Sequence, residues 1–472
     1  MPHVWSFRHG RPRTTQDTLN YTYDAAGHVA TMISSDQNVS VNYEYDTLNR
    51  LQHVVDSRLG TTTYAYDLAN NVTTATYPNS FQSIYTYDEL NRITAQASQV
   101  SGYTYQLGPT GNRTSASEYS GRQVTWSYDG IYRLTNESIT NAPNNKDGTV
   151  AYGLDPVGNR QSENSSLSGV PSGSFGFNAD DELSSESYDQ NGNTLATGGK
   201  TFTYDSQNHL VSMGSTVGLV YDGDGNRVKK IASSGTTTYL VDDLNPTGYP
   251  QVVEELTNGA VSRTYTYGLQ RISQDQVISN TWTPSFYGYD GGGNVRQLTN
   301  SAGAITDSYE YDAFGNKINS TGSTPNSYLY RGEYLDSDLG LYYLRARYYN
   351  PITGRFMSRD PEDGDPTVPV SLHKYLYANG DPVDALDPSG RDTLVEQVVV
   401  YVKRVLPAVI AAKTCGLAIY GLYSLIGDAL DNIYQLPGHK YVSQFALAKG
   451  VFGTAFACGS AYLGAAKFYG LL

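Results

Sequence analysis

The stretch YEYDAFGNKI, residues 309–318, contains a phrase that the chain repeats many times. An aromatic residue and one variable residue are followed by Tyr and Asp, then by a short run containing Gly or Asn, and then by a basic and an apolar residue. Close copies are YTYDAAGHV from Tyr21 and YTYDELNRI from Tyr85. The Asp residues of the first four copies are spaced by 22, 21 and 21 positions: Asp24, Asp46, Asp67 and Asp88. A period of this length indicates a repeat architecture.

Each copy predicts two strands joined by a turn. Residues 61–66 alternate with period two and are rich in Thr and Tyr, which is typical of a half-buried strand. Asp, small residues and Gly or Asn then supply the chemistry of a turn with positive φ. A basic–apolar pair such as Arg92-Ile93 begins the returning strand. We interpret the Tyr-Asp pair as structural, because a catalytic role repeated in every copy is implausible.

The composition fits many short strands and turns. The 472 residues include 42 Tyr and 47 Gly, which favour strands and turns respectively. A net charge of −14 argues against a nucleic-acid-binding shell, which would need a basic footprint. Only two cysteines occur, Cys415 and Cys458, too few for a disulfide scaffold. Basic residues at the N-terminus are followed by no apolar run, so no signal peptide is visible.

Two short motifs begin like ligand sites and fail in detail. TGGKT, residues 197–201, ends like a phosphate-binding loop, but Thr194 replaces the required Gly and no helical pattern follows. DGDGN, residues 222–226, begins like an EF-hand loop, but Arg227 occupies the sixth position instead of Gly. A looser calcium site is the minor alternative. We therefore expect no cofactor and no metal site.

The repeated phrase resembles the YD repeats of the Rhs family over roughly residues 20–390. That family includes bacterial polymorphic toxins, the C components of insecticidal toxin complexes and, more distantly, animal teneurins. The resemblance implies a mainly β protein whose antiparallel β-hairpins form a spiralling β-sheet shell. Stacking of neighbours is needed because a single repeat cannot bury its own face.

The segment 328–390 is closely similar to the core that follows the repeats in this family. It contains YRGE, GLYYLRARYYNP, GRF, SRDP and DPSG in that order. The likeness divides the chain into a YD-repeat β-shell (1–327), an Rhs core that closes the end of the shell (328–390) and a helical variable C-terminal segment (391–472).

In many members of the family the core is also an aspartyl autoprotease. The resemblance places the catalytic pair at Asp360, in SRDP, and Asp387, in DPSG, with Arg359 supporting the first. The scissile bond is then Arg391–Asp392. Paired carboxylates suit peptide hydrolysis, because proximity and burial leave one ionised to activate water and one protonated to assist the carbonyl.

The chain departs from the family pattern around this site. Arg391 stands where cleaving members have Leu, and Asp381 stands where Asn is expected. The loop from Asp360, DPEDGDPTVP, is acidic and somewhat long. An apolar pocket made for Leu would have to bury a charge, at a cost on the order of several kcal/mol. The alternative is a core that does not cleave, in which Asp360 and Asp387 are only turn and cap residues. No other catalytic motif occurs.

The sequence after Asp392 predicts a small α-helical segment. Its apolar residues step by three or four positions from Leu394 to Val409, which is a helical spacing. Its uncharged runs are shorter than a lone membrane span. A cationic, Gly-rich, apolar segment suggests membrane contact and disruption. The alternative is an ordinary buried helical hairpin or a remnant of cargo, with both cysteines as small core residues.

The resemblance implies a polymorphic toxin that encapsulates its own C-terminal segment, 392–472, as an effector and delivers it to competing cells. An immunity protein and a specialised secretion apparatus are the expected partners, and the expected location is secreted or on the bacterial cell surface. Two alternatives come from other classes. One is a surface adhesion or carbohydrate-binding repeat protein without toxic cargo, and the other is an autoprotease alone.

Overall fold

The computed structural model describes residues 18–364, 366, 368–391 and 393–395. Most of them form two long antiparallel sheets of 15 and 14 strands, and within each sheet the strands follow one another in chain order. The expected mainly β architecture of successive hairpins is therefore confirmed. The first sheet consists of β1 (Leu19–Tyr23), β2 (Val29–Ser34), β3 (Ser40–Tyr45), β4 (Leu51–Asp56), β5 (Gly60–Tyr66), β6 (Val72–Thr76), β7 (Gln82–Tyr87), β8 (Ile93–Ala97), β9 (Gly102–Leu107), β10 (Arg113–Glu118), β11 (Gln123–Tyr128), β12 (Leu134–Thr140), β13 (Gly148–Leu154), β14 (Arg160–Ser165) and β15 (Gly173–Ser174).

The second sheet continues in the same way, after which the chain forms smaller sheets of four and two strands and short 3₁₀ turns. The second sheet consists of β16 (Ser187–Tyr188), β17 (Thr194–Thr197), β18 (Lys200–Tyr204), β19 (Leu210–Met213), β20 (Val217–Tyr221), β21 (Arg227–Ala232), β22 (Gly235–Asp242), β23 (Gln251–Thr257), β24 (Ala260–Tyr267), β25 (Arg271–Ile278), β26 (Thr281–Tyr289), β27 (Val295–Thr299), β28 (Ile305–Tyr311) and β29 (Lys317–Thr321). The smaller elements are β30 (Tyr334–Asp336), β31 (Leu341–Leu344), β32 (Arg347–Asn350), β33 (Arg355–Phe356), β34 (Ala385–Leu386), β35 (Leu394–Val395), η1 (Pro143–Asn145), η2 (Tyr330–Gly332), η3 (Pro369–Leu372) and η4 (Ala378–Gly380).

The Tyr-Asp pair holds each hairpin together through its side chains. Asp88 Oδ1 accepts hydrogen bonds from the backbone N–H groups of Leu90 and Arg92, at 2.9 and 3.0 Å. The intervening Asn91 has a φ of 62°, as the turn chemistry requires. The hydroxyl of Tyr87 donates to the carbonyl of Val72 on the neighbouring strand, at 2.8 Å. The structural interpretation of the repeated phrase is thus confirmed.

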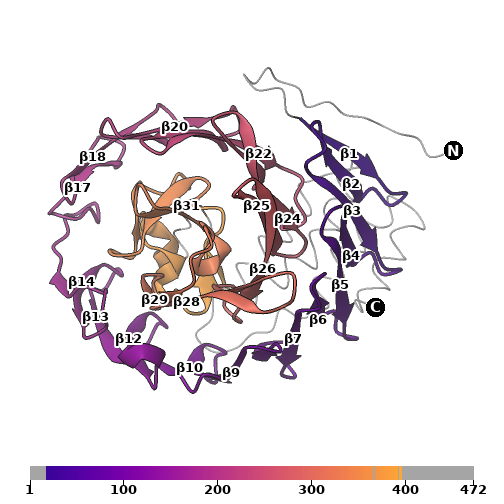
Figure 1. Ribbon diagram of the computed structural model, residues 1–472. Helices are drawn as coiled ribbons and strands as arrows, with labels where there is room; N and C mark the ends of the chain where they lie inside the picture. Colours follow the sequence, from indigo (N-terminus) through magenta and orange to yellow (C-terminus); the bar gives the residue numbers. More distant parts are fainter. Residues whose placement is uncertain (1–17, 365, 367, 392, 396–472) are drawn as a thin grey trace, which may run out of the picture.

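The two sheets wind into a spiral in which the end of the second sheet lies inside the start of the first (Figure 1). We call β1–β12 the outer coil and β22–β29 the inner coil. Side chains join the two coils directly. Tyr21 donates to Asp242 Oδ1 at 2.8 Å, and Asn79 donates to the carbonyl of Asn300 at 2.8 Å, each across 221 residues of sequence. The stacking that a single repeat needs is therefore supplied by the next turn of the spiral.

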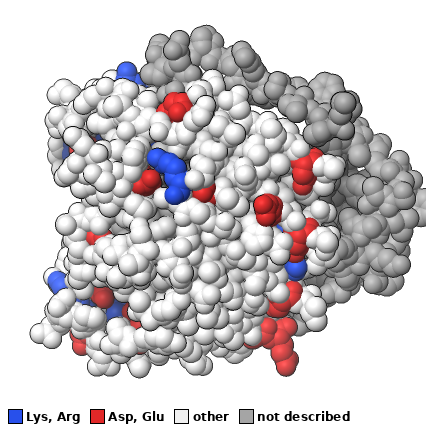
Figure 2. Space-filling view, turned by 45° about the vertical axis from the view of Figure 1, so that its right-hand side comes forward, with Lys and Arg blue, Asp and Glu red and all other residues white. Residues whose placement is uncertain are grey.

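The segment 328–390 lies at the centre of the spiral (Figure 1). Its Tyr328, Tyr342 and Tyr349 are buried in one large cluster with residues of both coils. On another side, Leu341 and Met357 belong to a cluster with apolar residues of β18–β20. The core is thus packed against the wall around it. Between the scattered charged residues, the face shown in Figure 2 is mostly uncharged.

The predicted tail helices lie almost entirely outside the described residues. The exception is the short strand β35, where Leu394 pairs with Leu386 and Val395 pairs with Ala385 of β34. The expectation that the helical pattern starts at Leu394 is therefore wrong, because this residue is the second half of a β-hairpin. Cys415 and Cys458 lie outside the described part of the chain.

Candidate functional site

The two aspartates predicted as a catalytic pair meet on one arginine of the core. Asp360 follows β33, Asp387 follows β34, and Arg347 begins β32. Arg347 Nη2 lies 2.7 Å from Asp360 Oδ2 and 3.2 Å from Asp387 Oδ2. Arg347 and Asp387 are buried, whereas the side chain of Asp360 keeps 15% of its exposure. Sequence reasoning missed Arg347, although it lies within the GLYYLRARYYNP stretch that carried the resemblance.

Arg359 does not occupy the supporting position expected for it. Its side chain is exposed and extends over Gly192, next to the hydroxyl of Tyr375. The backbone N–H of Asp360 donates to the carbonyl of Lys374 at 2.8 Å. In the described part of the chain, the arginine that pairs with both aspartates is therefore Arg347.

Two carboxyl groups, those of Asp360 and Asp387, share the single guanidinium group of Arg347. Burial raises the pKa of the Asp360 carboxyl, and nearby Asp387 adds to that rise, while Arg347 acts to lower it. Burial also lowers the pKa of the Arg347 guanidinium. Because one guanidinium faces two carboxylates, the three groups together favour the uptake of one proton. One ionised and one protonated carboxyl is the state that water activation beside a peptide requires.

The chain following Asp387 is held tightly. Asp387 Oδ1 accepts a hydrogen bond from the backbone N–H of Arg391 at 3.0 Å. Arg347 Nε donates to the carbonyl of Gly390. Gly390 has a φ of +69°, and a Cβ there would lie 2.2 Å from the carbonyl oxygen of Leu344. Glycine is thus required, and both polar groups of the Gly390–Arg391 peptide are held by the site. The predicted scissile carbonyl, that of Arg391, is the next one along the chain.

The side chain of Arg391 is not buried in an apolar pocket. It retains 51% exposure and pairs with Glu362, with Arg391 Nη1 lying 3.2 Å from Glu362 Oε1. The desolvation cost expected from placing Arg at a position made for Leu therefore does not arise.

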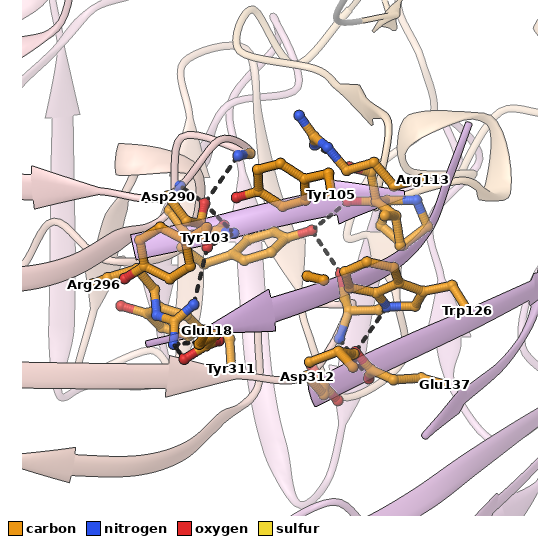
Figure 3. A pocket seen from close by; sticks show the side chains of 18 of the residues that line it. Tyr103, Tyr105, Arg113, Glu118, Trp126, Glu137, Asp290, Arg296, Tyr311 and Asp312 are labelled. Atoms are coloured by element: carbon orange, nitrogen blue, oxygen red, sulfur yellow. Dashed lines mark hydrogen bonds and ion pairs between the residues drawn. The ribbon is translucent and has the colours of Figure 1, made fainter. Parts of the chain in front are cut away.

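A second group of charged residues lies at the seam between the coils and the core (Figure 3). Glu118 of the outer coil accepts from Arg296 of the inner coil at 3.0 Å. Glu137 Oε2 accepts from the backbone N–H of Ala313 at 2.8 Å. Burial, reinforced by nearby Glu137, raises the pKa of Asp312 to about 7. These groups surround a cavity of about 70 Å³ and join three parts of the fold. The cavity is lined chiefly by Tyr103, Tyr105, Arg113, Glu118, Arg122, Trp126, Glu137, Asp290, Arg296, Asp312 and Arg331.

The part of the chain that the structure describes shows neither a metal-binding cluster nor a membrane-spanning helix. No group of three or more His, Cys, Asp or Glu side chains there is placed to hold a metal ion. No helix in that part of the chain is both long and apolar enough to cross a membrane.

Parts of the sequence are similar to known proteins. Residues 45–82 match the model of the RHS Repeat. The tRNA3(Ser)-specific nuclease WapA of Bacillus spizizenii is 30% identical over 376 residues, which cover 73% of this chain and 15% of that protein. The chain is an Rhs-repeat protein. Toxin protein Tse5 of Pseudomonas aeruginosa is 43% identical over 63 residues, or 13% of this Rhs-repeat chain and 4% of Tse5.

Solved structures share the fold of this Rhs-repeat chain. The crystal structure of TcdB2-TccC3 matches 79% of the chain with a TM-score of 0.65 at 20% identity. The Photorhabdus luminescens Tc holotoxin pore matches the same share with a TM-score of 0.65 at 17% identity. The chain spans 22% and 21% of the matched chains, and 15% of the length of WapA.

Proposed function

We propose that this chain is the core-bearing part of an Rhs-type toxin, which wraps and delivers its own C-terminal segment, 392–472, as an effector. The observation that carries the proposal is the position of the core. It lies at the centre of the spiral, and the chain continues toward the segment directly from the site formed by Asp360, Asp387 and Arg347. The relatives that bear the names nuclease and toxin support this function over an adhesion protein.

Release of the segment would come from self-cleavage at Arg391–Asp392. In this proposal Asp360, the more exposed carboxylate, takes a proton from the attacking water. Asp387 and Arg347 hold the chain just before the bond, through the N–H of Arg391 and the carbonyl of Gly390. Fixing the substrate next to the base lowers the barrier because no search for orientation remains. Asp360 and Asp387 are the catalytic residues of the proposal, and Arg347 replaces Arg359 as their support.

The effector role is tested by expressing the full chain and a chain that ends at residue 391 in bacteria. Growth and leakage of a membrane-impermeant dye report the effect of the segment. We expect the full chain to slow growth and the shortened chain to have no effect. Equal growth of both cultures, at equal protein levels, would contradict an effector in 392–472.

An immunity protein, a secretion apparatus and a secreted or cell-surface location are parts of the same proposal. The support for them is the similarity to toxin components. Co-expression of a candidate immunity protein should restore growth in the experiment above.

A further inference from the structure

Glu362 links the candidate catalytic residue Asp360 to the side chain at position 391. Its backbone N–H donates to Asp360 Oδ1 at 2.9 Å, and its carbonyl accepts from the ammonium group of Lys374. Its carboxylate reaches the guanidinium of Arg391 at 3.2 Å. The acidic loop that follows Asp360 is therefore anchored on a candidate catalytic group and presents a negative charge to the residue before the candidate scissile bond.

These contacts form a closed ring around the end of the core. From Asp360 it passes to Glu362, to the side chain of Arg391, through the backbone N–H of Arg391 to Asp387, and through Arg347 back to Asp360. A change in the side chain at position 391 thus acts on the same segment that both carboxylates hold.

The side chains of Arg391 and Glu362 are opposite in charge and touch each other. Glu362 belongs to the acidic loop that follows Asp360. We propose that Glu362 determines specificity, selecting a basic residue at position 391 for self-cleavage. This inference rests on the proposed self-cleavage and names the substrate of that site as a bond preceded by a basic residue.

The reaction itself consumes one water. The water oxygen bonds to the carbonyl carbon of Arg391 while the bond from that carbon to the nitrogen of Asp392 breaks. Arg391 ends as a carboxylate, and the two water protons end on the new amino group of Asp392, one of them relayed by Asp360. Glu362 forms and breaks no bond. It is a positioning residue that holds the side chain next to the reacting carbonyl.

The test measures the rate of processing of the newly synthesised full chain, by the appearance of the C-terminal fragment with time. Glu362→Arg and Arg391→Glu each place like charges together and should slow cleavage. The side chains at positions 362 and 391 are both exposed. The expected slowing is therefore roughly two- to fivefold, the range for one exposed ion pair. The double variant Glu362→Arg/Arg391→Glu restores the pair in reverse and should recover most of the rate.

Asp363→Arg is the matched control, because it changes the charge of the same exposed loop without contact to Arg391 in the described part of the chain. High salt should reduce the difference in cleavage rate between the single variants and the unaltered chain, since it screens exposed charges. Single variants as fast as the unaltered chain, or a double variant slower than either single variant, would overturn the role of Glu362. An unaltered chain that is never cleaved would instead overturn the proposed self-cleavage on which it rests.

Discussion

Single aspartates in equivalent turns have pKa values shifted in opposite directions because their surroundings differ. Asp88 lies on the outer coil, and although burial acts to raise its pKa, hydrogen bonds from Arg92 hold that pKa below its usual value. Asp312 occupies the same place in its own turn but is enclosed by the outer coil and the core, and burial together with Glu137 raises its pKa from 3.8 to about 7. The repeated phrase predicted both turns. It could not predict this difference, because the enclosing residues come from another turn of the spiral.

Asp312 should make the protein less stable as the pH rises. The unfolded chain loses this proton near pH 4 and the folded chain near pH 7, so folding is favoured below pH 4 and the advantage disappears between these values. The loss is on the order of a few kcal/mol. Asp312→Asn replaces the titrating carboxyl group with an amide that does not ionise, so the fall in unfolding free energy from pH 5 to pH 8 should be smaller in the variant. Denaturant unfolding at both pH values measures it, and equal falls in the two proteins would contradict the account.

Arg347 and Arg359 provide a second residue-level test, in which similar changes should have opposite outcomes. Arg347→Lys cannot reach both aspartates, the carbonyl of Gly390 and the carbonyl of Lys374 with one ammonium group, so processing should fall at least tenfold. Arg359→Lys changes an exposed side chain away from the pair and should leave processing unchanged. The fraction of cleaved chain on a denaturing gel measures processing in both variants. If Arg359→Lys reduced that fraction and Arg347→Lys did not, Arg359 would be the arginine that supports the aspartates.

At the scale of elements, hairpins were predictable and their docking was not. Period-two alternation and turn residues indicated the strands, and the Tyr and Asp side chains hold them as expected. The stretch 309–318 is where a hairpin meets the core, because the hydroxyl of Tyr330 donates to the carbonyl of Ala313 at 2.8 Å. That contact depends on the fold of the whole spiral. The start of the tail shows the same limit, since pairing with β34 overrides the helical spacing at Leu394.

Two glycines with the same φ allow packing on the core to be distinguished from turn geometry. Gly315 and Gly121 both have a φ of +90°. A Cβ at Gly315 would lie 2.6 Å from the ring of Tyr330, whereas one at Gly121 would meet nothing within 4 Å. Gly315→Ala should therefore destabilise the protein by about 1–3 kcal/mol more than Gly121→Ala. Thermal unfolding of the two variants measures the difference, and equal losses would mean that the turn does not pack on the core.

At the scale of the whole molecule, the repeat period and the core segment predicted a shell with its own closing element. The winding of the inner coil inside the outer coil was not predicted, nor was the buried ionic seam between them, because side chains about 180–220 residues apart form it. The TcdB2-TccC3 structure shares this fold at 20% identity. The wall packs around the core, and the core holds the backbone of Gly390 and Arg391, the place where we propose that the chain is cut.

Self-cleavage is tested most directly by the intact mass of the purified 472-residue chain under denaturing conditions. We expect two polypeptides whose masses add to that of the 51.5 kDa chain plus one water, with the boundary between Arg391 and Asp392. Asp360→Asn, prepared in the same way, should give a single polypeptide of full mass. A single species of full mass from the unaltered chain, or a boundary elsewhere, would contradict self-cleavage at this bond.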